Sequence, residues 1–574
     1  MLEDVPSDVE KKSACSYRKE EINQINAGYQ NWFNNSLRDQ DRETDGNYAT
    51  HSGIPVKLIH TPVDIGHLDY MDDIGFSGHP PYVRGVYPNM YRGRTFTVRQ
   101  LAGLGAPEDC NKRVRYLMDH GATGVSILFD LPTIRGYNSD DPEADGNVGA
   151  CGTAVDSAWD MDAYFKDIDL GRVSTSIVTH LPSTSLVIPG MYFTVAEQRG
   201  TPWSALAGTC QNDFIMETCV GSAPEILPPK VSFRMQCDVV EWICKHIPRW
   251  NPISYNGYNL REAGGDAVDE VAVGIANAVE TADELIRRGM HVDDFAPRMS
   301  FFWDIHNDFF EEIAKCRASR KVWYKLMSER YNAKNPKSLL MRYHAQTSGG
   351  SLPATEPLNN VARSAIHGLG GVLGGCQSLH IDSYDEAYSA PTEEAALISL
   401  RTQQIIQAET GVCATVDPLA GSYYVEYLTD QMTERILCRI REIESLGGLV
   451  AAVEDGWLHR EISAYNQAHQ KKIESGEMKI VGVNYQQPRN TETTPIDVFE
   501  YPETQQRQTE KLKRLRRERS NARVEASMDM LRQKCHTGEN LFPHCLEAVK
   551  NLATLGEIEE LFREEFGLWD FPLL

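Results

Sequence analysis

The runs PISYNG (252–257), DEVAVGIANAVETADELIRRG (269–289) and RMSFFWD (298–304) follow one another along the chain. The first and the third are short, apolar and bounded by turn or polar residues, as buried β-strands are. The middle run repeats its apolar side chains at the period of an α-helix. A strand, a helix and a second strand in this order predict a parallel β-α-β unit.

The same alternation recurs about eight times between residues 95 and 425. The strand candidates are TFTVRQLAG, GVSILFD, RVSTSIVTH, LAGTCQND, PISYNG, RMSFFWD, LLMRYHAQT and CQSLHID. A doubly wound open sheet would give a similar pattern, but it usually carries a glycine-rich phosphate loop after its first strand, and no such loop is found. We therefore expect an α/β fold with a (β/α)8 TIM barrel over residues 61–425.

Two further regions flank the predicted barrel. Residues 1–60 are expected to form an N-terminal arm, whose Tyr29, Trp32 and Phe33 anchor it either to another molecule or to the chain's own core. Residues 426–574 are predicted to be a helical C-terminal region. Its basic run KLKRLRRER (511–519), interleaved with two leucines, is predicted to be a solvated helix face.

The composition excludes several classes of protein. A formal net charge of −24 argues against nucleic acid as a partner. No apolar run is long enough to cross a membrane, and the start MLEDVPSDVEKKS has no signal pattern, so we expect a cytoplasmic protein. The 13 cysteines are scattered without metal-ligand or redox spacing. We expect reduced thiols and no metal site, with a metal site as the weaker alternative.

Polar residues end most of the strand candidates. In a TIM barrel these strand ends and the loops after them form the active-site face. Each single residue is also explained as the N-cap of the next helix, so the functional signal is their convergence. The residues are Asp130, His180, Asp213, Asn256, Asp304, Thr347 and Asp382.

The segment HPPYVRGVYPNMYRGRTFTVRQLAG (79–103) concentrates positive charge in an acidic protein. It holds Arg84, Arg92, Arg94 and Arg99, three tyrosines and no acidic residue. A guanidinium offers a fork of donors that suits phosphate oxygens, whereas an arginine packed over a tyrosine ring is structural. We expect the four arginines to divide between these two roles.

Long motifs occur in a fixed order along the chain, among them PYVRGVYPNMYRGRTFTVRQLAG, FDLPTIRGYNSD, LAGTCQND, EAGGDAVDE, FAPRMSFFW, QTSGGSL, GGCQSLHIDSYDEA and VDPLAGSYYVE. In these motifs the chain resembles the large, substrate-binding chain of the adenosylcobalamin-dependent acyl-CoA mutases, the methylmalonyl-CoA mutase family. The resemblance runs from about residue 60 to the C-terminus. It implies an isomerase that rearranges the carbon skeleton of an acyl-CoA by a radical 1,2-migration.

The resemblance also implies site residues. The family's barrel is threaded by the pantetheine arm of coenzyme A, and basic residues at the mouth hold the nucleotide phosphates. The positions that match substrate or CoA contacts are Arg94, Thr97, Arg99, Leu101, Ser126, Ser176, Gln211, Gly221, Asn251, Arg298, Ser300 and Ser378. Tyr258 and Asn259 match the catalytic position, and Glu262, Gln346, Gly350 and Glu386 match the face that binds the cofactor.

The cofactor implied by the resemblance is adenosylcobalamin. Family members that act alone carry a cobalamin domain marked by Asp-x-His-x-x-Gly, whereas the one Asp-x-His here, Asp304 to His306, is followed by Asn-Asp-Phe. We therefore expect a separate small cobalamin-binding subunit to supply the cobalt ligand, as in two-subunit isobutyryl-CoA/2-hydroxyisobutyryl-CoA mutases. The expected assembly is a heterotetramer containing a homodimer of large subunits, and a G-protein chaperone is a further candidate partner.

Four positions depart from the family pattern. Asn259 stands where the family has a histidine that can donate a proton near the thioester, and an asparagine amide cannot act as a general acid. His180 is a candidate substitute, although a strand-end hydrogen bond also explains it. Gly221, Leu101 and Gly350 replace an arginine, a tyrosine and a tryptophan, which predicts a larger and more apolar acyl pocket.

These departures shape the expected substrate. We expect a bulky or branched acyl-CoA and not methylmalonyl-CoA, because Gly221 cannot neutralise a substrate carboxylate and an unpaired buried charge is costly. Isobutyryl-CoA or a hydroxyacyl-CoA is the alternative substrate. A catalytically impaired paralogue that only binds acyl-CoA is the alternative function, and a generic barrel lyase or isomerase accounts less well for the arginine cluster.

Overall fold

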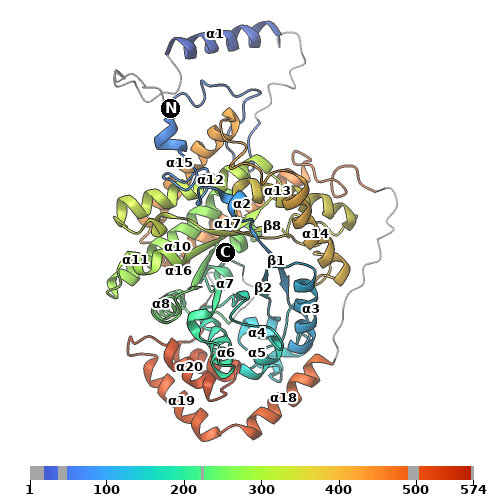
Figure 1. Cartoon of the computed structure of the whole chain (residues 1–574), viewed down its shortest axis with the longest axis vertical. Helices are drawn as coiled ribbons and strands as arrows, with labels where there is room; N and C mark the ends of the chain where they lie inside the picture. Colours follow the sequence, from blue (N-terminus) through green and yellow to red (C-terminus); the bar gives the residue numbers. More distant parts are fainter. Residues whose placement is uncertain (1–18, 37–47, 221–224, 489–502, 571–574) are drawn as a thin grey trace, which may run out of the picture.

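A parallel β-sheet forms the centre of the protein in the computed structural model, which describes residues 19–36, 48–220, 225–488 and 503–570 (Figure 1). Its strands lie in the order β5-β4-β3-β2-β1-β9-β8-β7-β6. The strand bounds are β1 Thr97–Ala102, β2 Gly124–Ile127, β3 Ser174–Val178, β4 Ala207–Gln211, β5 Trp250–Asn251, β6 Ile253–Asn256, β7 Met299–Ile305, β8 Tyr343–Thr347 and β9 Ser378–His380.

The two ends of this sheet meet in a single stretch of chain. β5 pairs with β4 and β6 pairs with β7, and only Pro252 separates β5 from β6. Proline has no backbone N–H to donate to a strand ladder, so the chain changes its pairing partner at this residue. Because the nine strands thus occupy eight positions around a nearly closed barrel, the predicted (β/α)8 architecture is confirmed.

A helix follows each strand position and covers the outside of the barrel (Figure 1). The stretch 269–289 shows why: Val271, Ile275 and Val279 recur at helical spacing and are buried in the core. Asp266 caps the start of that helix by accepting hydrogen bonds from the N–H groups of Val268 and Asp269. In chain order the covering helices are α3 Pro107–Asp119, α5 Ala158–Tyr164, α6 Thr184–Gln198, α8 Pro229–His246, α10 Ala267–Arg287, α12 Phe309–Lys325, α13 Asn360–Gly374 and α14 Glu393–Glu409.

The chain before the barrel falls into two described parts. Helix α1 (Lys19–Ser36) is drawn away from the barrel in Figure 1, and none of its described side chains is buried. On this helix Tyr29 packs against Trp32 and Phe33, with ring centroids 5.9 and 6.1 Å apart. The predicted anchors of the arm therefore contact one another, while residues 1–18 and 37–47 lie outside the described residues.

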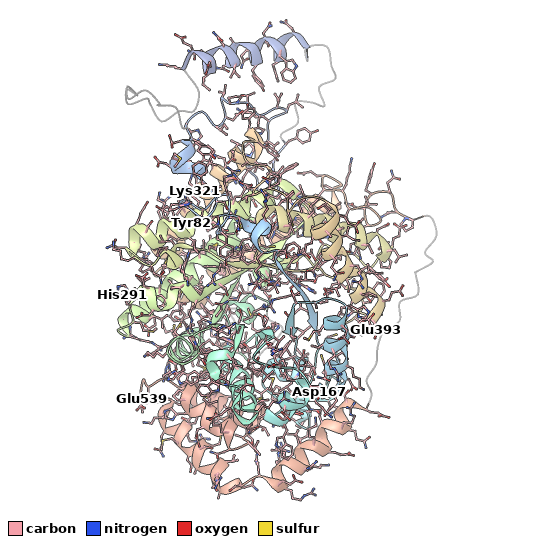
Figure 2. The ribbon with its side chains drawn as sticks, viewed as in Figure 1. Tyr82, Asp167, His291, Lys321, Glu393 and Glu539 are labelled. Atoms are coloured by element: carbon pink, nitrogen blue, oxygen red, sulfur yellow. The ribbon has the colours of Figure 1, made fainter. Side chains whose placement is uncertain are left out.

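The arginine-rich segment after residue 78 packs against helix α12. Arg320 of α12 donates hydrogen bonds to the backbone carbonyls of Tyr82 and Val83, and the neighbouring Lys321 pairs with Asp73 at 2.8 Å (Figure 2). Buried donors on a barrel helix thus satisfy carbonyl groups of a segment that has no strand partner of its own. This fixes the chain that leads into the short helix α2 (Met90–Gly93) and into β1.

The C-terminal region is helical, and several of its helices pack on the helices of the barrel. Helix α15 (Tyr423–Ser445) packs on α10 and α12, whereas α20 (Phe542–Lys550) packs on α6. The other helices of this region are α16 Leu449–Glu454, α17 Trp457–Glu474, α18 Thr504–Glu518, α19 Asn521–Lys534 and α21 Leu555–Phe566.

The basic run on α18 is not a merely solvated face, which corrects the prediction from the sequence. Lys511 pairs with Asp160 at 2.8 Å, and Arg516 pairs with Asp140. The interleaved Leu512 and Leu515 are buried. Because the barrel surface under α18 is acidic, the basic helix is held by opposite charge as well as by its leucines.

Two further expectations concern membranes and thiols. In the part of the chain that the structure describes, every helix is too short or too polar to span a bilayer. Eleven cysteines of that part are free, and burial raises the pKa of most of them, for example of Cys210 to about 12. Such thiols are inert at neutral pH.

Candidate functional site

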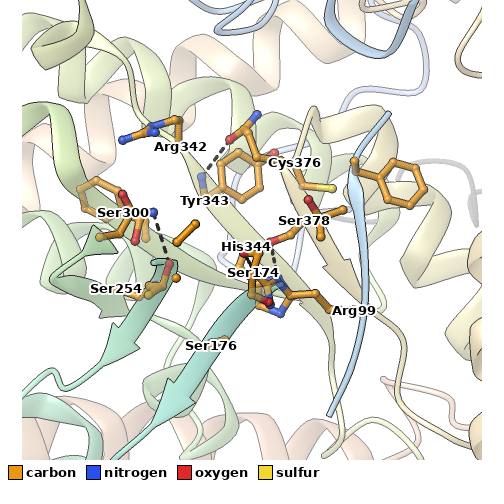
Figure 3. A pocket seen from close by; sticks show the side chains of 18 of the residues that line it. Arg99, Ser174, Ser176, Ser254, Ser300, Arg342, Tyr343, His344, Cys376 and Ser378 are labelled. Carbon is orange, nitrogen blue, oxygen red and sulfur yellow. Dashed lines mark hydrogen bonds between the residues drawn. The ribbon is translucent and has the colours of Figure 1, made fainter. Parts of the chain in front are cut away.

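A cavity of about 270 Å³ opens at the amino ends of the barrel strands and reaches into the barrel (Figure 3). Its lining comes from the first residues of β1, β3, β6, β7, β8 and β9, and along β4 it extends to the last residue, Gln211. The lining is rich in hydroxyl groups, supplied by Thr95, Thr97, Ser174, Ser176, Thr209, Ser254, Ser300 and Ser378. This is the end of the barrel opposite to the strand ends that the sequence singled out.

The charge of the cavity is opposite to that of the protein. Arg94, Arg99, Arg249 and Arg342 line it, and no Asp or Glu occurs among the described lining residues. Arg94, Arg249 and Arg342 each lie just before a strand, so parallel pairing brings all three to the amino-end mouth. Four guanidinium groups without a carboxylate make this cavity a site for an anion with several charges, such as a nucleotide phosphate.

Arg99 is the innermost of these arginines, and it is buried. Its guanidinium donates hydrogen bonds to the carbonyl of Val125 at 2.9 Å and to the hydroxyl of Ser174 at 2.8 Å. Burial lowers the pKa of Arg99 to about 10, which still leaves it charged near neutral pH. Beside it His344 donates or accepts a hydrogen bond with Ser378 at 2.7 Å, and burial together with Arg99 holds the pKa of His344 well below its ordinary value.

The structure brings many of the predicted substrate residues into one cavity. Those that line it are Arg94, Thr97, Arg99, Ser176, Gln211, Asn251, Ser300 and Ser378. The sequence analysis missed Arg249, Arg342 and His344. The signal that could have found Arg249 and Arg342 is a basic residue at the start of a strand: they directly precede β5 and β8, and Arg94 lies three residues before β1.

Leu101 and Ser126 lie on neighbouring strands and are not among the described lining residues of the cavity. They pair in register with each other, and Ser126 pairs with Ser176, which does line the cavity. Residues in register on neighbouring strands share a face of the sheet. Leu101 and Ser126 therefore face the barrel interior in the same layer as Ser176, next to the inner end of the cavity.

Two predicted residues take other places. Arg298 lies outside the cavity lining, because its guanidinium donates to the carbonyls of Ile243 at 2.9 Å and Cys244 at 3.2 Å, near the end of α8. It satisfies carbonyl groups that a helix end leaves without partners. Gly221 lies outside the described residues.

A second polar group of side chains gathers at the carboxyl ends of the strands. Helix α9 (Tyr258–Glu262) begins just after β6 and carries Tyr258, Asn259 and Glu262. The amide of Gln346, on β8, donates to the Tyr258 hydroxyl and to the carboxylate of Asp382, each at 3.0 Å. Tyr258 stacks on the ring of Phe302 with centroids 4.8 Å apart, so both the ring and the hydroxyl are held in place.

The side chain of Asn259 is oriented by one neighbour. Its Oδ1 accepts a hydrogen bond from Nδ2 of Asn256 at 3.0 Å, and its backbone N–H donates to Oδ1 of Asn256 at 2.9 Å. The acceptor of the Asn259 amide is thus used within the chain. The Nδ2 group remains to donate to a ligand carbonyl.

Carboxylates surround the Tyr258 hydroxyl. Burial, with Glu262 and Asp382 nearby, raises the pKa of Tyr258 well above its ordinary value. Burial raises the pKa of Glu262 as well, although the Ser348 hydroxyl and the Gly350 N–H donate to its oxygens at 2.7 and 2.6 Å. For Glu386, burial and three neighbouring carboxylates hold the pKa well above its usual range. This face favours uncharged hydroxyl groups that donate to carboxylates, as ribose hydroxyls do.

The glycine pair at 349–350 lies close to the side chains of α9. A Cβ atom added to Gly350 would lie 3.0 Å from Oε2 of Glu262, and one added to Gly349 would lie 3.3 Å from the Tyr258 hydroxyl. A side chain at either position would therefore displace Glu262 or Tyr258 slightly.

Several of the polar strand ends are structural. Asp130 caps helix α4 (Leu131–Arg135) by accepting from the N–H of Thr133 at 3.0 Å. Asp213 accepts from the N–H groups of Asn256 and Ile215, and burial raises its pKa to about 7. Asp130 and Asp213 therefore cap a helix or hold a loop in place. This is the structural interpretation that was the alternative to a role in the active site.

His180, by contrast, has one ring nitrogen that makes no hydrogen bond. Its Nδ1 lies 2.7 Å from Oε1 of the buried Glu217 on α7 (Ile215–Val220), whereas its Nε2 is buried without a hydrogen-bond partner. The backbone of His180 has φ +58°, in the left-handed region, where a non-glycine residue is strained. Helix α7 packs against α9, so this pair lies beside the helix that carries Tyr258 and Asn259.

Comparisons with known proteins agree with this geometry. The family model of methylmalonyl-CoA mutase matches residues 49–568. The 2-hydroxyisobutanoyl-CoA mutase large subunit of Aquincola tertiaricarbonis is 41% identical over 524 residues, covering 91% of this chain and 92% of that protein. The methylmalonyl-CoA mutase of Cereibacter sphaeroides is also 41% identical over 524 residues, covering 91% of this chain and 72% of that protein.

The human mitochondrial methylmalonyl-CoA mutase is 38% identical over 523 residues, covering 91% of this chain and 68% of that protein. Mutases with different substrates are thus equally similar to this chain, so identity alone does not select a substrate. The enzymes of the family are isomerases that depend on cobalamin. With a matching family model over most of its length and a barrel whose cavity suits a nucleotide, the chain belongs to the methylmalonyl-CoA mutase family.

Proposed function

We propose that this chain is the catalytic large subunit of an adenosylcobalamin-dependent mutase that rearranges a bulky or branched acyl-CoA and not methylmalonyl-CoA. The observation that carries the proposal is the barrel cavity with four arginines and no carboxylate among its described lining residues, which leads toward the α9 helix at the opposite end. A single elongated substrate with an anionic handle and a reactive acyl end fits this arrangement.

The handle of the substrate is coenzyme A. Its phosphates lie at the mouth against Arg94, Arg249 and Arg342, where charge-assisted hydrogen bonds are about twice as strong as neutral ones. The hydroxyl-lined barrel interior accommodates the amide groups of the pantetheine arm. The thioester then reaches Gln211, and the Nδ2 group of Asn259 donates to its carbonyl oxygen.

The cofactor face is the carboxyl end of the barrel. Glu262 and Glu386 are the acceptors for ribose hydroxyls, and Gln346 and the glycine pair at 349–350 form the surface that the corrin covers. These residues fit the group because buried carboxylates with raised pKa values need donors. Adenosylcobalamin supplies the organic radical that starts the rearrangement, and the chain's own residues orient the acyl group and exclude water.

Asn259 limits the proton chemistry of the site. A neutral amide stabilises the thioester carbonyl by donating a hydrogen bond, but it cannot transfer a proton. We infer that His180, oriented by Glu217, takes over recognition of a polar group on the acyl part of the substrate. When Nδ1 donates to Glu217, Nε2 of the neutral ring is an acceptor, which suits a hydroxyl group.

The partner of the chain is a small cobalamin-binding subunit that supplies the cobalt ligand. The large-subunit name of the Aquincola relative supports this proposal. We propose a heterotetramer with a homodimer of large subunits, assisted by a G-protein chaperone. A second candidate function, a paralogue that binds acyl-CoA without turnover, is favoured only by Asn259.

The proposal is tested with the full chain, the small subunit that co-purifies with it, adenosylcobalamin and a panel of acyl-CoA esters. We expect isomer formation and a radical signal with branched or hydroxylated esters. Turnover of methylmalonyl-CoA at a similar rate would contradict the proposed substrate. Binding of CoA esters without any turnover would favour the paralogue, and no binding of any CoA derivative would contradict the proposal as a whole.

Pocket residues can be tested separately by exchanging them. The double substitution Leu101→Tyr and Gly221→Arg restores the two large side chains that the family uses for methylmalonyl-CoA. If these positions set specificity, the double variant gains methylmalonyl-CoA turnover and loses activity with the bulky ester. An unchanged substrate preference would show that the acyl group is recognised elsewhere.

A further inference from the structure

A cluster of metal-ligating side chains lies outside the arginine-lined cavity, just beyond the carboxyl end of β7. His51 belongs to the segment that precedes the barrel, and Asp308 and Glu311 belong to the start of helix α12. One ring nitrogen of His51 and one carboxylate oxygen from each acidic residue all lie within 4.8 Å of one another. The three side chains come from parts of the chain about 260 residues apart, as the hydrogen bond between Ser52 and Glu311 (259 residues) illustrates.

The backbone holds one oxygen of each carboxylate in place. The N–H of His51 donates to Oδ2 of Asp308 at 3.0 Å, and the N–H of Ser52 donates to Oε1 of Glu311 at 3.1 Å. The remaining oxygen of Glu311, Oε2, is buried without a hydrogen-bond partner, and so is Nδ1 of His51. Buried polar atoms normally have partners, because a buried polar atom without one loses its hydrogen bonds to water and gains none in return.

Two further histidines lie beside the cluster. The rings of His306 and His469 lie 6.0 and 6.2 Å from that of His51. Imidazole binds a metal through the lone pair of a ring nitrogen.

The charges that face the cluster do not exclude a cation. Asp308, Glu311 and Glu312 are the acidic groups near His51, and Arg261 and Lys472 are the basic ones. Arg261 already pairs with the buried Glu312 at 3.4 Å. The two carboxylates that face His51 are therefore the ones without a cation of their own.

We propose that His51, Asp308 and Glu311 bind one divalent cation of the zinc class, which joins the segment before the barrel to helix α12. A set of one imidazole and two carboxylates is typical of zinc and of its first-row neighbours, whereas calcium and magnesium prefer oxygen ligands alone. The hydrogen bonds from the His51 and Ser52 backbone orient the carboxylates, as outer partners do in metal sites. None of its three ligands is among the residues proposed above to contact the substrate or the cofactor.

The test uses the full-length chain after treatment with EDTA. Zinc is added back, its content per chain is measured by mass spectrometry and its affinity by calorimetry. We expect close to one zinc ion per chain and a zinc-dependent rise of the melting temperature by about 2 °C or more. Cobalt(II), added in place of zinc, reports the site through its visible absorption.

Two variants and one control distinguish a built site from surface binding. His51→Ala and Glu311→Gln should each weaken zinc binding about tenfold or more and abolish the zinc-dependent rise of the melting temperature. Glutamine keeps the acceptor for the Ser52 N–H, so Glu311→Gln is the variant that preserves the fold. His67→Ala removes a histidine from another carboxylate pair, His67 with Asp430, on the exposed surface, and should change nothing.

The zinc-binding measurements either support or overturn the proposal. Zinc bound equally by the wild type and by Glu311→Gln would overturn the proposal, as would loss of binding in His67→Ala alone. Because each variant is compared with itself in EDTA and in zinc, a variant of lower stability still reports whether zinc stabilises it.

Discussion

Arg99 reaches across strand β2 and donates a hydrogen bond to the hydroxyl of Ser174 on β3, at 2.8 Å. It can do so because Gly124, the residue paired with Arg99 on β2, has no side chain. A Cβ atom at Gly124 would lie 2.9 Å from Nη1 of Arg99 and 3.0 Å from its Cζ. The position of the Arg99 guanidinium in the cavity thus depends on Gly124. No charge pattern in the sequence reveals the role of this glycine.

Gly124→Ala should therefore displace the Arg99 guanidinium. We expect a loss of about 1–3 kcal/mol in the free energy of unfolding, as for overpacked core positions, together with weaker CoA binding. Gly171→Ala is the matched control, because its new Cβ would meet its nearest atom at an ordinary 3.4 Å. Chemical denaturation and calorimetry with CoA measure the two effects, and equal behaviour of the two variants would refute the role of Gly124.

Arg94 is predicted to bind phosphate through an exposed side chain. Arg94→Ala should weaken CoA binding about tenfold, because it removes one charge-assisted hydrogen bond that solvent partly screens. The difference from the wild type should shrink as salt is added, since added ions screen exposed charges. Arg92→Ala, an exposed arginine outside the cavity lining, serves as control and should bind CoA normally.

His180 and Glu217 are predicted to act together on the acyl part of the substrate. His180→Asn and Glu217→Gln should each lower kcat/KM for the cognate ester about 10–100-fold while the affinity for free CoA stays unchanged. His544→Asn, a control far from the barrel interior on α20, should leave both parameters intact, and a parallel loss of CoA affinity in His180→Asn would indicate a structural role.

Lys315 is the centre of a buried ionic network. It is fully buried and donates to Glu270 at 2.6 Å, to the carbonyl of Asp304 at 2.6 Å and to Glu312. Lys315→Met should cost about 3–5 kcal/mol of unfolding free energy, because it removes the nearer cation from two buried carboxylates and leaves them only Arg261, at 4.0 Å from Glu270 and 3.4 Å from Glu312. Lys534→Met breaks an exposed pair with Glu539 and should cost less than about 1 kcal/mol. Denaturant titration distinguishes the two.

Glu559 makes stability depend on pH. Its carboxyl is buried on α21 with Oε1 lacking a partner, and burial raises its pKa from 4.5 to about 7. Since the folded pKa exceeds the unfolded one, the folded state binds a proton first. This contribution to stability therefore grows as the pH falls through about 7 and is lost as the pH rises through it.

Glu559→Gln should remove that dependence. At pH 8 the variant should be more stable than the wild type by about 1–3 kcal/mol, because no charge is buried, and the gain should vanish toward pH 5. Thermal melts from pH 5 to about pH 8 measure it. The exposed neighbour provides the control, Glu560→Gln, for which we expect no pH-dependent difference. A wild type that is equally stable across this range would contradict the prediction.

The sequence by itself determined the barrel. Each β-α unit is encoded locally by a short apolar run followed by a helical period, and PISYNG, the helix after it and RMSFFWD became β6, α10 and β7. Motif resemblance also predicted Arg94, Arg99, Ser176 and Gln211 as residues of one site, and they line one cavity, since motifs preserve positions relative to strands. The strand and helix patterns and the motifs each involve residues that are close together in the chain. A single sequence is therefore enough to recognise them.

Only the tertiary structure decided which of these residues meet. Barrel closure at Pro252 brings Arg249 and Arg342 to the mouth beside Arg94, whereas Arg298 is taken up by carbonyls of α8. The contact of Arg99 with Ser174 depends on the register of the strands and on the glycine at position 124. The contact of His180 with Glu217 likewise forms only when the strands have paired. Because side chains far apart in the chain become neighbours only after the sheet closes, local sequence cannot specify them.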